Sequence, residues 1–103
     1  MTSAVRPDQS HLGVATKVRF DGDMLIVTLS NGREVTAPVS DYPRLLAATP
    51  TQRANFQIEA FGTSIHWPDV DEDIGVNYLI GVTEEELARF AGFTIYSSRP
   101  PTV

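Results

Sequence analysis

Apolar and polar residues alternate in three short stretches near the start of the chain. Residues 14–20 have the period of a half-buried strand, residues 24–29 form a second apolar run, and residues 33–37 form a third. Two dipeptides that favour tight hairpin turns, Asp21-Gly22 and Asn31-Gly32, separate these stretches. The pattern predicts an antiparallel meander of three strands.

Two short helices are expected after the meander. The first begins near Pro43, with Ser40 or Asp41 as its cap, and helical spacing turns three side chains toward the core: Tyr42, Leu45 and Leu46. The second begins at Pro50, and two residues have the spacing of a capping box at its start: Thr49 and Gln52.

Alternation returns at residues 56–61 and again at residues 64–67, with Gly62 between them. We expect a second β-hairpin, in which one face carries Phe56, Ile58 and Ala60. Adjacent residues of a strand face opposite sides, so Trp67 enters the core and His66 faces the surface.

The last part of the chain has two helical patterns. In the first, Asp73 is the expected cap and Gly81 the expected end, and three residues share the apolar face: Val76, Leu79 and Ile80. In the second, Thr83 and Glu86 have the spacing of a capping box, and the expected buried stripe is Leu87, Phe90 and Ala91. Residues 93–96 could add a short strand.

These elements define an α+β fold: a small single domain with an antiparallel β-meander, short helices, a second β-hairpin and a C-terminal helix. Within the 103 residues we expect this domain at 13–96, a flexible tail at 1–12 and a second tail at 97–103. Its predicted core includes Val27, Leu45, Ile58 and Trp67.

The amino-acid composition and the absence of several motifs exclude some classes of protein. The chain has no cysteine, which excludes disulfides and thiolate chemistry. It has neither an apolar run long enough to cross a membrane nor a secretory signal at its start, so a cytoplasmic protein without a membrane partner is expected. We find no nucleophile elbow, no phosphate-binding glycine loop and no paired-histidine helix.

Charge is distributed unevenly along the chain. The formal net charge is −5, yet acids and bases balance over residues 1–68. Residues 69–86, the acidic segment, contain no base and seven acids: Asp69, Asp71, Glu72, Asp73, Glu84, Glu85 and Glu86. A protein that binds phosphates needs a basic patch, so direct nucleic-acid binding is not expected.

Three aspartates at alternate positions, Asp69, Asp71 and Asp73, have the spacing of a calcium loop. Such a loop also needs glycine at its sixth position and glutamate at its twelfth, where this chain has Ile74 and Ile80. We therefore predict neither a metal nor another cofactor. Acids before or within the first turn of a helix also stabilise that helix, and this explanation of the acidic segment stays open beside a binding surface.

The functional hypothesis from the residues is a non-enzymatic protein-interaction module with a basic protein partner, and a homo-oligomer is left open. An acidic surface would attract that partner. Its candidate residues are Asp69, Asp71, Glu72, Glu84 and Glu85. The alternative is a metal-dependent enzyme that uses His66 with Asp69, Asp71 and Asp73.

Residues 14–81 also resemble a family of small bacterial proteins, domain of unknown function 2442. The matching residues include Tyr42-Pro43-Arg44-Leu45, Ile65-His66-Trp67-Pro68 and Asp71-Glu72-Asp73-Ile74. The resemblance implies a compact α+β domain and assigns no catalytic or binding residues. It also implies a small two-protein system of the toxin–antitoxin kind. Some relatives carry a helix-turn-helix domain, for which residues 82–103 are too few.

Overall fold

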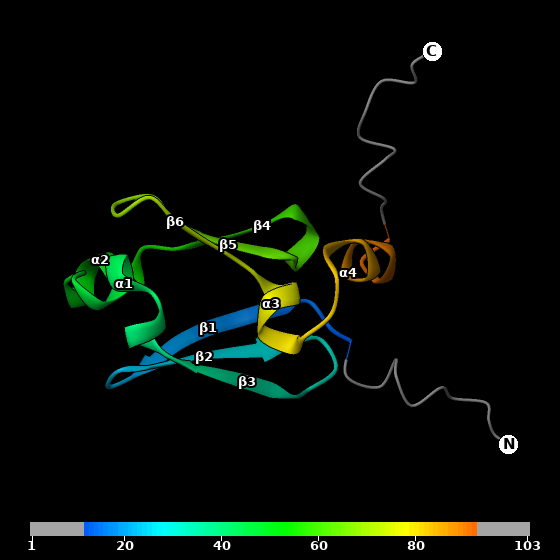
Figure 1. The fold of residues 1–103 in the computed structure, drawn as a ribbon, viewed down its shortest axis with the longest axis horizontal. Helices are drawn as coiled ribbons and strands as arrows, with labels where there is room; N and C mark the ends of the chain where they lie inside the picture. The colour runs from blue at the N-terminus through cyan, green and yellow to red at the C-terminus, as the bar shows by residue number, and fades with distance from the viewer. Residues whose placement is uncertain (1–11, 93–103) are drawn as a thin grey trace, which may run out of the picture.

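Two three-stranded antiparallel sheets form the framework of the protein (Figure 1). The structure is a computed structural model and describes residues 12–92. The first sheet is the predicted meander, with β1 (Ala15–Asp21), β2 (Met24–Leu29) and β3 (Glu34–Pro38) in that order. Gly22 and Gly32 occupy its two turns with positive φ angles of 60° and 89°, which glycine adopts without strain. The local turn signals therefore set this half of the fold.

The connection between the sheets contains a 3₁₀ helix, η2 (Val39–Asp41), and two short α-helices, α1 (Pro43–Leu46) and α2 (Pro50–Ala54). The predicted capping box of α2 is confirmed, because Thr49 Oγ1 accepts a hydrogen bond from the Gln52 amide at 3.1 Å. The predicted cap of α1 is wrong, since Tyr42 precedes this helix and makes no side-chain cap. Leu46 was expected in the core but is exposed, because α1 ends after a single turn.

The second sheet contains β4 (Gln57–Glu59), β5 (Ser64–Trp67) and β6 (Glu72–Gly75) in that order. The predicted strand through Phe61 ends early, at a 3₁₀ helix, η3 (Ala60–Gly62), in which three successive residues have positive φ. Gly62 lies so close to β1 that a Cβ on it would be 2.8 Å from Val14 Cβ. This close approach leaves no room for a side chain at position 62.

Strand β6 was not predicted, because its acids have the pattern of a helix cap. Ile74 lies opposite Ile65 on the buried face, and Asp73 lies opposite His66 on the outer face. The prediction that Asp73 caps the next helix is therefore wrong. That helix, α3 (Val76–Ile80), begins after Gly75 without a side-chain cap. Pairing with β6 satisfies the backbone groups on the second edge of β5, which outweighs the local preference of the acids.

Helix α3 ends at Gly81, whose φ of 77° confirms the predicted stop. The last described helix, α4 (Glu84–Phe90), has the predicted capping box, in which Thr83 Oγ1 accepts from the Glu86 amide at 3.0 Å. Its buried residues are Leu87 and Ala88, while Phe90, expected in the stripe, is exposed.

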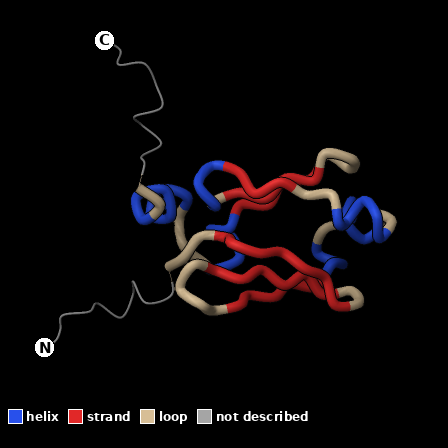
Figure 2. Tube along the Cα trace, turned by 180° about the vertical axis from the view of Figure 1, so that it is seen from behind, coloured by secondary structure: helices blue, strands red, loops and turns tan. Residues whose placement is uncertain are grey.

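The core lies between the two sheets and is closed by the helices (Figure 2). Val27, Leu45 and Trp67 are fully buried as predicted, and Ile58 is half-buried against them. The Trp67 ring meets two other aromatic rings, with centroid distances of 6.2 Å to Phe20 and 6.3 Å to Phe56. The protein is thus a small single α+β domain, as predicted.

Within residues 12–92, no helix has the length and apolar character needed to cross a membrane. The predicted strand at 93–96 and the predicted tails lie outside these residues, apart from Leu12.

Candidate binding cleft

The acidic segment is divided between the two ends of the molecule. The turn between β5 and β6, which holds residues 68–71, lies at the end where α1 and α2 lie, whereas α4 lies at the opposite end (Figure 1). Figure 2 shows the same separation from behind. Asp69, Asp71 and Glu72 therefore do not share one surface with Glu84 and Glu85, although they were grouped in the sequence.

Acids at the β5–β6 turn fasten the turn to the neighbouring helices. Asp69 accepts a hydrogen bond from Asn55 Nδ2 at 3.0 Å, and Arg44 of α1 donates to the backbone carbonyl of Asp71. Arg44 also lies 3.9 Å from the Asp71 carboxylate. Asp71 has a positive φ of 54°, so the turn is tight. Asp69 thus holds the turn through its side chain, and Asp71 holds it mainly through its backbone carbonyl.

Glu72 is half-buried at the same end, beside Tyr42. Burial of the phenol, followed by the nearby charges of Asp41 and Glu72, raises the pKa of Tyr42. Tyr42 therefore stays neutral at physiological pH.

The three alternating aspartates have three different partners. Asp69 bonds to Asn55, Asp71 to Arg44, and Asp73 to His66, where Nδ1 and Oδ1 are 2.7 Å apart. Within residues 12–92, no three histidine, aspartate or glutamate side chains are arranged to hold a metal ion. The structure thus brings only one of the three aspartates to His66.

His66 and Asp73 face each other across β5 and β6 on the outer surface of the second sheet. The hydrogen bond to Asp73 raises the pKa of His66, burial opposes this rise, and the charges of Asp73, Glu59 and Asp71 add to it. His66 faces outward and Trp67 inward, as the alternation predicted. A His–Asp pair on an outer surface of this kind can exchange a proton with solvent.

A cleft of about 380 Å³ opens beside this pair, between the second sheet and α4. Its acidic residues are Asp73 and Glu84, and its aromatic residue is Tyr78, which is 80% exposed. The remaining lining residues are small, polar or apolar: Ala60, Thr63, Ser64, Gly75, Asn77, Leu87 and Ala88. Among the described residues that line the cleft there is no lysine or arginine.

Gly75 shapes the floor of this cleft. A Cβ at this position would lie 2.6 Å from Asn77 Oδ1 and 3.3 Å from Tyr78 Cδ2. Its φ of −77° suits any residue, so the lack of a side chain, and not backbone freedom, is what matters here. Glycine thus lets the Asn77 amide and the Tyr78 ring pack directly against β6.

From the sequence, Glu84 was expected in the binding surface, and Asp73 was expected as a helix cap or, in the alternative, in a metal site with His66. Asn77 and Tyr78 were missed. One signal was present, because the apolar face of this helix, formed by Val76, Leu79 and Ile80, leaves Tyr78 on the opposite side. Glu85 instead lies 3.9 Å from Arg89, one helical turn away.

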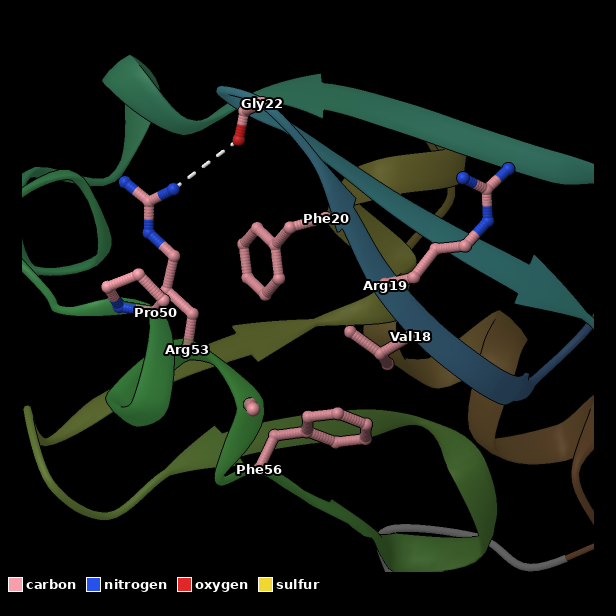
Figure 3. Close-up of a pocket in the computed structure, with 8 residues that line it drawn as sticks. Val18, Arg19, Phe20, Gly22, Pro50, Arg53 and Phe56 are labelled. Carbon is pink, nitrogen blue, oxygen red and sulfur yellow. Dashed lines mark hydrogen bonds between the residues drawn. The ribbon is translucent and has the colours of Figure 1, made fainter.

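A second groove, of about 410 Å³, lies beside β1 and α2 (Figure 3). Its floor contains Phe20 and Phe56, and Arg53 stands at its side. Arg53 donates to the carbonyls of Leu45, Leu46 and Gly22, and its guanidinium lies 5.5 Å from the Phe20 ring centroid. Because Arg53 already donates to backbone carbonyls of the protein itself, the cleft beside α4 is the stronger candidate for a ligand site.

The protein is therefore a small α+β domain of two antiparallel sheets closed by short helices, with an acidic cleft at one end. The chain belongs to the family described as a protein of unknown function (DUF2442), whose match spans residues 15–81, more than half of the chain. This assignment confirms the resemblance seen in the sequence. The family description states no activity.

One solved structure is similar to this chain: a crystal structure of a protein of unknown function from Rhodospirillum rubrum ATCC 11170. Its TM-score is 0.58 and its sequence identity 27%, and the match covers 74% of this chain and 98% of that one. A search of curated proteins finds no match.

Proposed function

We propose that this protein is a non-enzymatic protein-interaction module that binds a basic protein partner at the cleft beside α4. The observation that carries the proposal is the exposed Tyr78 ring in a cleft with Asp73 and Glu84. An aromatic ring beside two carboxylates suits the contact surface of a protein partner, since tyrosine is enriched at interfaces.

Charge supports a basic partner. The Glu84 side chain has no hydrogen bond or ion pair with other residues in the range 12–92, so its carboxylate is available. The formal net charge of −5 adds long-range attraction for a cationic surface and repels nucleic-acid phosphates. In a two-protein system of the kind that the resemblance implies, the partner would be a second small protein in the cytoplasm.

Photo-crosslinking from the cleft tests this proposal. A photoreactive phenylalanine analogue replaces Tyr78 in one variant and, in the control, Asp21, the exposed last residue of β1. The turn between β1 and β2 lies at the end of the sheets away from α4 (Figure 1). The protein captured in the native host is identified, purified and titrated calorimetrically against the wild type. We expect a basic protein, captured from position 78 in preference to position 21, whose affinity falls as salt rises.

Two charge variants complete the test. Glu84→Gln should weaken binding about fivefold, the effect of losing an exposed ion pair of about 1 kcal/mol. Asp21→Asn removes the same charge at the β1–β2 turn and should leave binding unchanged. Equal capture from both positions, or affinity that responds neither to salt nor to Glu84→Gln, would contradict the proposal.

A further inference from the structure

We infer that the cleft receives the guanidinium group of a single arginine side chain of the partner. This inference rests on the proposed function and specifies the chemistry that the cleft recognises. Its starting point is a buried acceptor. Asn77 is only 9% exposed, and its Nδ2 donates to the carbonyl of Val82 at 3.4 Å. Its Oδ1 accepts no hydrogen bond from residues 12–92.

The position of Asn77 Oδ1 directs this acceptor toward the cleft. Asn77 and Gly75 both line the cleft, and Oδ1 is 2.6 Å from the point where a Cβ on Gly75 would lie. The bond from Nδ2 to Val82 fixes the orientation of the amide, with its oxygen on the side of β6. A buried acceptor without a donor is costly, so a ligand that donates an N–H here would gain from satisfying it.

Two carboxylates extend this set of acceptors. Asp73 Oδ1 is bonded to His66, which leaves Oδ2 without a partner among the described residues, and the Glu84 carboxylate is likewise unpaired there. The described part of the cleft therefore presents an amide oxygen and two carboxylates, and none of its lining residues within 12–92 is basic. Guanidinium matches this arrangement, because it carries five N–H donors and no acceptor.

Tyr78 distinguishes guanidinium from ammonium. The edge of its ring lies along the cleft, with Cδ2 at 3.3 Å and Cε2 at 3.6 Å from the Cβ position built on Gly75, and most of the side chain is exposed. A planar guanidinium stacks on such a ring while its edge donates to the acceptors, whereas the compact lysine ammonium makes fewer directed bonds. An anion would meet two carboxylates and no compensating charge.

The test uses short peptides that differ only at one central residue, which is arginine, lysine or citrulline. Citrulline has nearly the shape of arginine but no charge. Each peptide is titrated into ¹⁵N-labelled full-length protein and followed by NMR. We expect the arginine peptide to shift the backbone amides of residues 75–78 and 84 and the Asn77 side-chain amide. We expect binding about tenfold weaker with citrulline and a few-fold weaker with lysine.

Variants of the protein separate recognition from folding. Tyr78→Leu should weaken the arginine peptide about fivefold and reduce its advantage over lysine, since the exposed ring contributes stacking. The fold survives this change, because Tyr78 lies outside the core. Asp21→Asn is the matched charge control and should not change the affinity. Free L-arginine, titrated in parallel, distinguishes a small-molecule ligand: tighter binding of free arginine than of the peptide would overturn a protein partner.

The outcomes also separate this inference from the proposed function. Equal binding of arginine and citrulline peptides, or shifts confined to residues outside the cleft, would overturn the arginine site. If a basic partner still binds and depends on Glu84 in that case, the interaction module stands without it. If neither peptide nor partner responds to Glu84→Gln, both proposals fail.

Discussion

Trp67 Nε1 donates a hydrogen bond of 3.0 Å to the backbone carbonyl of Arg53. This bond joins the centre of the second sheet to the last turn of α2, and the Trp67 ring packs between Phe20 and Phe56. The only tryptophan of the chain therefore links both sheets and the helical connection.

The first prediction concerns how much Trp67 contributes to the free energy of unfolding. Trp67→Ala should lower the free energy of unfolding by about 3–5 kcal/mol, because it leaves a large cavity in the core. Trp67→Phe keeps an aromatic ring, loses the bond to Arg53, and should cost less. Urea denaturation followed by far-ultraviolet circular dichroism measures both. A midpoint that is unchanged in Trp67→Ala would mean that the core does not depend on this ring.

The second prediction concerns Arg53, whose side chain is 16% exposed. Arg53→Met should destabilise the fold by about 1–3 kcal/mol, since it removes the side-chain donor of the Leu46 carbonyl and leaves the Leu45 carbonyl with backbone donors alone. Arg53→Lys should not restore the loss, because one ammonium cannot reproduce the planar set of donors. Arg19→Met is the control. Arg19 is 55% exposed beside Glu34, and its loss should cost less than about 1 kcal/mol. Equal effects in the thermal melts of the two methionine variants would contradict this role.

The third prediction concerns pH. The pKa of His66 in the folded protein lies above its ordinary value of 6.5, first because of the bond to Asp73. The protonated pair should therefore stabilise the fold fully below pH 6.5, and this contribution should vanish as pH rises through the folded pKa. NMR titration of the His66 ring should give a lower pKa in Asp73→Asn. Glu59→Gln, on β4, should lower it less. An identical titration curve in Asp73→Asn would disprove the pair.

The fourth prediction separates stability from binding in α4. Thr83→Ala removes the capping box and should cost about 0.5–2 kcal/mol. Glu84→Gln removes one first-turn charge and should cost only about 0.3–1 kcal/mol. Thermal melts at matched pH distinguish the two variants. If Glu84→Gln were the more destabilising variant, the main role of the Glu84 carboxylate would be to stabilise α4. An effect of this substitution on binding could then be due to the change in stability.

The parts of the fold that were predictable have local causes. Asp21-Gly22 and Asn31-Gly32 define the turns of the first sheet, and Thr49 and Thr83 start their helices as expected. Strand β6 has no such local cause. It depends on the pairing of Ile74 with Ile65, nine positions apart, whereas its acids favour a helix start.

The candidate cleft was harder to predict from the sequence, for the same reason. Charge alone grouped Asp71 with Glu84, and the fold separates them. Asn77 and Tyr78 became recognisable only once α3 was packed against Gly75, because a side chain's exposure and its missing hydrogen-bond partner are properties of the folded chain.

The division of the acidic segment has a consequence for how its two parts should vary among related proteins. The Asp71 charge faces Arg44 of the same chain, so the residues at these two positions should covary among related proteins, whatever the protein binds. The Glu84 charge faces outward, so if Glu84 contacts a partner protein as proposed, changes at this position should track a residue encoded in the partner's gene. Two neighbouring stretches of one acidic sequence would then covary with different residues, one stretch with residues of the same chain and the other with residues of the proposed partner.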